Sequence, residues 1–152
     1  MAIEVGQPAP PFTLLNRDRE KVTLESYPEQ HMVLAFYPLA FTGGCTSEMQ
    51  AYRDELYLFE EIGAQVLGIS VDSFAAAGEF QDKLTTGFPL LSDFPSNQTG
   101  IDYGAYDEKF GFHDRMTVII DKDRIIRGIY RERKDYASHP GAALEVLKSL
   151  DA

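Results

Sequence analysis

The only cysteine of the 152-residue chain, Cys45, follows two glycines and directly precedes a predicted amphipathic helix. A cysteine reacts as its thiolate, and the positive end of a helix N-terminus stabilises that anion. The glycine bend lets backbone amides approach an anion closely. A free cysteine without such a context is most often a buried apolar side chain. The position of Cys45 in a glycine bend instead predicts a reactive thiol.

Thr42 and Pro38, which precede Cys45 in the sequence, have the chemistry to shape a pocket around a thiolate. The hydroxyl of Thr42 can reach the sulfur across a tight bend, or it can cap the helix or bond within the turn. Pro38 ends a buried strand, stiffens the loop and has no N–H. A cation is missing locally, because Arg53 lies about two helical turns further along and is expected to point to solvent. A second segment must therefore supply the positive charge.

The overall charge disfavours anionic partners. The chain has 14 Lys and Arg against 24 Asp and Glu, which gives a formal net charge of -10. An acidic chain is repelled by the nucleic-acid backbone and by anionic lipid surfaces. Apolar residues make up 44% of the chain, yet no apolar run approaches the ~20 residues of a membrane span. We expect neither nucleic acid nor a membrane as a partner.

Cysteine and histidine usage gives no indication of a metal site. A single cysteine excludes an intrachain disulfide, and His31, His113 and His139 are scattered without zinc-ligand spacing. The N-terminal stretch has no basic region followed by an apolar one, so nothing directs export and a cytoplasmic location is expected. Neither a metal nor a cofactor is expected.

Hydrophobic periodicity predicts an α/β domain spanning residues 1–152, with helices on both faces of a mixed sheet. The helix after Cys45 has apolar residues at helical spacing, and Ser73 is positioned to cap the next helix. The expected elements are a hairpin at 12–24, a strand at 31–38, a helix at 46–60, a strand at 64–72, a helix at 74–84, a short strand at 88–94, a hairpin at 116–130 and a helix at 140–150.

Pro38, Thr42 and Cys45 together form the pattern P-x-x-x-T-x-x-C, which resembles the active site of the peroxiredoxins. The segments "VGQPAPPFTLLN", "VLGISVD", "FPLLSDF", "YGAYDE" and "RMTVIID" also resemble segments of that family, in the same order. The stretches "FYPLAFTGGCTSE" and "FPLLSDF" are most similar to the small one-cysteine subgroup that resembles alkyl hydroperoxide reductase E. The resemblance thus covers nearly the whole chain.

This resemblance implies a thioredoxin-like fold and assigns roles to residues. Cys45 would be the peroxidatic cysteine, Thr42 its hydrogen-bond partner and Pro38 a shield of the pocket. Arg115 matches the active-site arginine of the family and would supply the missing cation; without the resemblance it reads as a solvated arginine at a strand end. Glu48 lies either near that arginine or on the surface of the first helical turn.

The sequence leaves two interpretations open for each of His113 and Phe41. An exposed loop position is expected for His113, with a place at the pocket rim as the alternative. Phe41 near the motif, together with the resemblance, suggests a homodimer, although this ring can equally line its own pocket.

The implied activity is thiol-dependent reduction of hydrogen peroxide or organic hydroperoxides through a cysteine sulfenic acid. Many relatives carry a resolving cysteine, but Gln50 stands at one of its positions and the chain has no second cysteine. An external thiol must therefore recycle Cys45: thioredoxin, a glutaredoxin-like protein or a low-molecular-weight thiol. The alternatives are a non-enzymatic redox sensor, or a thiol-disulfide oxidoreductase, which normally needs Cys-x-x-Cys where this chain has Thr42.

Overall fold

A seven-stranded sheet forms the centre of the protein, of which the computed structural model describes residues 3–150. The strand order is β2-β1-β5-β4-β3-β8-β9. The strands β3, β4 and β5 run parallel, whereas β1, β2, β8 and β9 pair antiparallel with their neighbours. Their bounds are β1 (Leu14–Leu15), β2 (Lys21–Val22), β3 (His31–Phe36), β4 (Ala64–Ser70), β5 (Leu90–Ser92), β8 (Met116–Ile120) and β9 (Ile126–Arg131).

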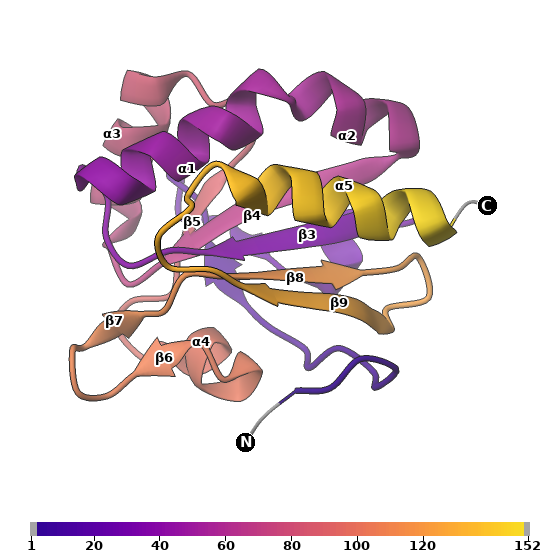
Figure 1. Cartoon of the computed structure of the whole chain (residues 1–152). Helices are drawn as coiled ribbons and strands as arrows, with labels where there is room; N and C mark the ends of the chain where they lie inside the picture. The colour runs from indigo at the N-terminus through magenta and orange to yellow at the C-terminus, as the bar shows by residue number, and fades with distance from the viewer. Residues whose placement is uncertain (1–2, 151–152) are drawn as a thin grey trace.

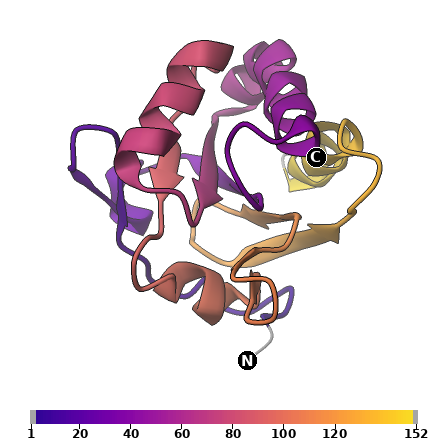
Figure 2. The same cartoon turned by 90° about the vertical axis from the view of Figure 1, so that its left-hand side faces the viewer.

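Helices cover both faces of this sheet, as Figures 1 and 2 show. One face carries α1 (Gly43–Asp54), α2 (Leu56–Ile62), α3 (Phe74–Leu84) and α5 (Ser138–Leu150). The other face carries α4 (Gln98–Tyr103), the small sheet of β6 (Tyr106–Asp107) and β7 (Phe112–His113), and the N-terminal segment. A 3-10 turn, η1 (Leu24–Ser26), follows β2. Among the described residues, no helix has the length and apolar character to cross a bilayer.

The central strand β3 separates two apolar clusters, because successive side chains of a strand point to opposite faces. Val33 and Ala35 pack in the cluster under α1, α3 and α5, and Leu34 and Phe36 pack in the cluster on the α4 side. Every residue of β3 is buried. The strand that leads into the cysteine loop is therefore held rigidly from both faces.

The α/β class, the mixed sheet and the coverage of both faces are confirmed, and most elements lie where periodicity predicts them. Ser73 caps α3 as expected, accepting a hydrogen bond from the amide of Ala76.

The helix predicted for 46–60 differs, because it begins earlier, ends at Asp54 and resumes after Glu55 as α2. The expectation of a solvent-directed Arg53 was wrong: its Nη1 donates to the carbonyl oxygen of Leu84 at 2.8 Å.

Candidate active site

Cys45 lies in the first turn of α1, and its side chain is fully buried. The chain leaves β3, passes through a short loop and enters the helix after Thr42, whose backbone is extended. The amide of Ala40 donates to the carboxylate of Asp72 at 2.8 Å, which ties this loop to the segment after β4. The sulfur is thus positioned at the positive end of a helix by a fixed loop.

Arg115 supplies the cation that the cysteine segment lacks. It immediately precedes β8, and the antiparallel register pairs Met116 with Phe36 at the end of β3. The guanidinium Nη2 donates to Sγ of Cys45 at 3.5 Å, and Nη1 donates to Oε1 of Glu48 at 2.7 Å. Only 7% of Arg115 is exposed, so its charge acts in a poorly solvated environment where electrostatic interactions are strong.

Tyr136, from the segment between β9 and α5, covers this arginine. The Cζ atom of Arg115 lies 4.6 Å from the centre of the tyrosine ring, a geometry in which the ring face attracts the cation. Gly44 makes room for the ring, since a Cβ there would lie 2.8 Å from Cζ of Tyr136. The second glycine of the bend therefore has a steric reason to be glycine.

Glu48 is fully buried behind Arg115, one helical turn after Cys45. Of the two alternatives for this residue, contact with the arginine is the one observed. Burial raises the pKa of the Glu48 carboxyl to about 8, although the neighbouring Arg115 opposes that shift. A proton on this carboxyl is therefore stable near neutral pH.

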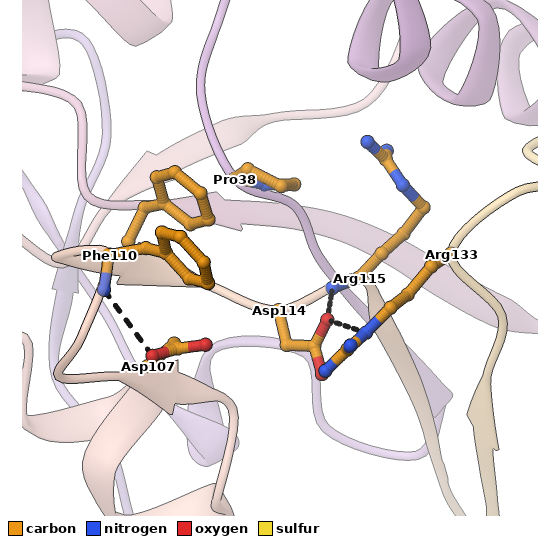
Figure 3. Close-up of a pocket in the computed structure, with 7 residues that line it drawn as sticks. Pro38, Asp107, Phe110, Asp114, Arg115 and Arg133 are labelled. Carbon is orange, nitrogen blue, oxygen red and sulfur yellow. Dashed lines mark hydrogen bonds and ion pairs between the residues drawn. The ribbon is translucent and has the colours of Figure 1, made fainter.

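A cavity of about 220 Å³ opens beside Arg115. Figure 3 shows Pro38 and Phe110 on one side of it and Asp114 with Arg133 on the other. The guanidinium of Arg115 extends away from Asp114. The lining residues are Pro38, Asp107, Phe110, Phe112, Asp114, Arg115 and Arg133. Apolar rings and charged groups thus meet beside the arginine that contacts the sulfur.

Asp114 fixes the entrance of β8. Its Oδ1 accepts from the backbone amide of Arg115 at 2.9 Å, and its two oxygens accept from the Arg133 guanidinium at 2.9 and 2.8 Å. Partial burial opposes ionisation of this carboxyl, but these hydrogen bonds and charges hold its pKa below the usual range. Asp114 therefore stays ionised, orients the guanidinium of Arg133 and fixes the backbone at Arg115.

Thr42 is exposed, and its Oγ1 donates to the carbonyl oxygen of Leu39 at 2.9 Å. This bond lies within the turn, one of the alternatives that the sequence leaves open for this hydroxyl. The structure thus brings Arg115 to the sulfur and Pro38 to the adjoining cavity, while the Thr42 hydroxyl bonds to its own loop.

The expectation of an exposed His113 was wrong. Its side chain is fully buried, and Nε2 lies 3.0 Å from Oδ2 of Asp93. The same aspartate accepts from the backbone amides of Thr99 and Gly100 at the start of α4. A Cβ on Gly100 would lie 2.0 Å from the imidazole, so the glycine admits the ring. His113 is a structural link between β7 and α4, a helix that the sequence patterns did not predict.

Tyr136 and His139 at the site were missed by sequence reasoning. Both lie just before or within the start of α5, far from the cysteine motif in sequence. Nδ1 of His139 lies 3.7 Å from Oε2 of Glu48. The one available signal was that this histidine lies four residues before Ala143, in line with the apolar face of the predicted helix at 140–150, which would have indicated burial had the helix been extended to it.

The fold and the site are those of a thiol enzyme, with a cysteine at a helix N-terminus and an arginine at its sulfur. Comparison with known proteins agrees. The AhpC/TSA family model matches residues 5–129. Peroxiredoxin Q, chloroplastic, of Oryza sativa subsp. japonica is 36% identical over 149 residues, covering 97% of this chain and 68% of that protein. Alkyl hydroperoxide reductase E of Mycobacterium bovis is 38% identical over 127 residues, covering 82% of this chain and 83% of that protein.

Solved structures give the same result. Peroxidoxin BcpB from Mycobacterium tuberculosis superposes with a TM-score of 0.91 at 27% identity, covering 99% of each chain. Peroxiredoxin Q from Xanthomonas campestris has a TM-score of 0.82 at 27% identity, covering 91% of this chain and 90% of that one. The chain belongs to the AhpC/TSA family of peroxiredoxins. It is a thiol-dependent peroxidase with a thioredoxin-like fold and a single cysteine.

Proposed function

We propose that Cys45 is the peroxidatic cysteine, with Arg115, Thr42 and Pro38 as the other active-site residues. The observation that carries this assignment is the 3.5 Å contact between Nη2 of Arg115 and Sγ of Cys45. A buried sulfur beside a buried cation at a helix N-terminus is an environment that favours a thiolate. Pro38 shields the pocket as part of the cavity wall. Residues 1–152 act as one catalytic domain.

In the proposed reaction the thiolate attacks one peroxide oxygen. An S–O bond forms while the O–O bond breaks; sulfur loses two electrons, and the departing oxygen takes up a proton and leaves as water or an alcohol. Negative charge grows on both oxygens in the transition state, and the guanidinium of Arg115 stabilises it. Thr42 contributes by rotating its hydroxyl from the Leu39 carbonyl towards the bound peroxide.

The sulfenic acid is recycled by an external thiol, because the chain has no second cysteine. One thiol displaces water and forms a mixed disulfide, and a second thiol reduces that disulfide. Thioredoxin, a glutaredoxin-like protein and a low-molecular-weight thiol are the candidate reductants. Comparing the three as sole reductants in a steady-state peroxidase assay identifies the one that supports turnover.

The proposed assembly is a homodimer. Two exposed aromatic rings close to the site support it: Phe41, 52% exposed in the cysteine loop, and Phe110, 61% exposed at the cavity. Light scattering over a range of protein concentrations measures the mass directly. A dimer that dissociates in Phe41→Glu or Phe110→Glu supports this assembly, and a monomer in the wild type contradicts it.

The proposed location is the cytoplasm. A single unpaired cysteine that depends on thiol reductants suits a reducing compartment. The peroxiredoxin Q relatives from plants are named as chloroplastic. Imaging of a fluorescent fusion in the native cell decides this point, since a signal confined to an organelle or to the exterior contradicts the proposal.

Intact-mass spectrometry tests the catalytic assignment. Equimolar peroxide should add one oxygen to the wild type, trapped by dimedone, and excess peroxide without thiol should add a second. A thiol should instead give a mixed disulfide and prevent further oxidation. Cys45→Ser, a small change that removes only the nucleophile, should show neither adduct nor turnover. Peroxide consumption by Cys45→Ser would overturn the assignment.

A further inference from the structure

A chain of buried polar groups continues behind Arg115 and Glu48. His139 of α5 is fully buried, and its Nδ1 lies 2.9 Å from Oγ1 of Thr117. That hydroxyl in turn lies 2.6 Å from the hydroxyl of Tyr52 on α1. The chain thus connects α1, β8 and α5, and it ends at the carboxyl that holds Arg115.

The hydrogen positions in this chain follow from one fixed acceptor. Nε2 of His139 lies 2.8 Å from the carbonyl oxygen of Glu132; a carbonyl only accepts, so Nε2 carries a hydrogen. In the neutral imidazole, Nδ1 is then an acceptor and takes the hydrogen of Thr117, which accepts from Tyr52. Every group in the chain is satisfied when His139 is neutral. Burial also lowers the pKa of His139, which favours this neutral form.

This arrangement leaves one carboxyl oxygen of Glu48 without a hydrogen bond from any residue that the structure describes. Its Oε1 accepts from Arg115, but Oε2 is buried and has no hydrogen-bond partner among the described residues. The polar atom facing it is Nδ1 of His139 at 3.7 Å, which carries a lone pair and no hydrogen. That lone pair already accepts from Thr117, so an ionised Oε2 would be buried with no donor in the described part of the chain, whereas a protonated carboxyl avoids burying an unpaired charge.

The charge on Glu48 determines whether the positive charge of Arg115 is neutralised by Glu48 or interacts with the sulfur of Cys45. The guanidinium faces both Oε1 of Glu48 and Sγ of Cys45. If both were anions, two buried negative charges would compete for one cation. With a neutral Glu48, the cluster holds one cation and one thiolate, which burial penalises less.

The groups around this cluster come from several elements, and they are consistent with a neutral carboxyl. Tyr37 and Tyr52 are buried nearby and their pKa values are raised, first of all by burial, so both remain neutral. Arg115 is the cation that faces Glu48. The charged and titratable groups that face His139 are Glu48, Arg115, Glu132, Asp135 and Tyr130 of β9, whose ring centre lies 4.9 Å from that of the imidazole.

We propose that His139 is a positioning residue that keeps the Glu48 carboxyl protonated, so that the positive charge of Arg115 acts on the sulfur of Cys45. The proposal rests on the assigned role of Cys45 as the attacking thiolate. It concerns the resting enzyme, and its tests therefore measure ionisation and not turnover. If Cys45 proved not to reduce peroxide, the measurements of ionisation would still test the role of His139.

The first test measures the protonation state of His139 directly in the wild-type protein. Nitrogen-15 NMR of the imidazole, assigned with His31→Gln and His113→Gln spectra, distinguishes the two ring nitrogens. We expect a hydrogen on Nε2 and none on Nδ1 at neutral pH. An imidazolium with hydrogens on both nitrogens would overturn the proposal, because His139 would then donate to an ionised Glu48.

The second test measures the pH midpoint of Cys45 ionisation from ultraviolet thiolate absorbance, with the Cys45→Ser spectrum subtracted. His139→Asn places an amide donor opposite Oε2, stabilises the carboxylate and should raise the midpoint by at least about half a pH unit. Ser138→Ala, on the neighbouring residue of α5, is the matched control and should not move it. An unchanged midpoint in His139→Asn would contradict the proposal.

A double variant separates this role from a purely structural one. Glu48→Gln keeps the side chain neutral at every pH and should leave the midpoint near that of the wild type. If His139 acts through Glu48, adding His139→Asn to Glu48→Gln should produce no further shift. A shift of the same size with and without Glu48 would overturn the proposal, because His139 would then act by another route.

Discussion

The ring of Tyr136 lies over the guanidinium of Arg115, with 4.6 Å between the ring centre and Cζ. This contact holds the arginine from the side opposite the protein core, while Glu48 holds it from within. The cation at the sulfur is therefore positioned by residues from α1 and from the segment that precedes α5.

Gly44→Ala should disturb this arrangement, because the new Cβ would lie 2.8 Å from Cζ of Tyr136 and 3.1 Å from Nη2 of Arg115. We expect the ring to move off the arginine and the peroxide rate constant to fall about tenfold, or ~1.4 kcal/mol. Stopped-flow oxidation measures it. Gly43→Ala is the matched control, since nothing lies within 4 Å of its Cβ. Equal rates in the two variants would contradict the steric role of Gly44.

Arg115→Lys should lower the peroxide rate constant by more than tenfold. The two guanidinium nitrogens contact Glu48 and Cys45 separately, and a lysine ammonium keeps the charge but loses this planar fork. Single-turnover kinetics with equimolar peroxide reports the chemical step. A rate within a factor of about two of wild type would mean that Arg115 contributes less than roughly 0.5 kcal/mol to the transition state.

Glu48 should make stability decrease as pH rises. Its pKa is raised from 4.5 to about 8 in the folded protein, so between these values the folded state binds more protons than the unfolded state. The free energy of unfolding therefore falls across this window. In Glu48→Gln this fall should be absent. The free energy of unfolding of the variant should therefore increase relative to that of the wild type by about 1 kcal/mol or more between pH 5 and 7.5.

Urea unfolding at several pH values measures this dependence. The titration of His139, whose pKa is lowered, acts in the opposite direction below pH ~6.5. That contribution is common to wild type and variant, so it cancels to first order in their difference. A constant difference across the window would show that Glu48 is ionised throughout.

His113→Ala should destabilise the protein without changing the reactivity of the cysteine. The variant leaves a cavity against Gly100 and removes the buried partner of Asp93, which together should cost about 3 kcal/mol. Denaturant unfolding gives the loss. The ultraviolet ionisation midpoint of Cys45 is the control readout and should stay at the wild-type value. A stability within 0.5 kcal/mol of wild type, on the scale of an ordinary surface change, would contradict the structural link.

The elements around the cysteine were predictable because they carry strong local signals. The buried run of β3 is followed closely by Pro38, the glycine bend precedes amphipathic spacing, and Ser73 is a good helix cap. Arg115 was assigned by resemblance and not by any local signal. Its contact with the sulfur depends on the antiparallel pairing of β8 with β3, which sequence patterns alone do not specify.

The residues that sequence reasoning missed act through tertiary contacts. Tyr136 lies in a polar segment with no periodicity, and α4 is only six residues long, too short for a helical pattern to stand out. The burial of His113 follows from α4, so the error about the histidine has the same origin. Glu48 looks like an ordinary helix-surface residue until Arg115 is placed beside it.

The break at Glu55 divides the helical segment after the cysteine loop into two helices, which are packed together through Tyr52 and Phe59. A protein reductant can reach the fully buried sulfur of Cys45 only if the cysteine loop and the start of α1 open locally. Opening that extends to Tyr52 would also break its ring contact with Phe59 of α2. Amide hydrogen exchange in α1 measures the free energy of this local opening, which sets the fraction of molecules in which a protein reductant can reach the sulfur.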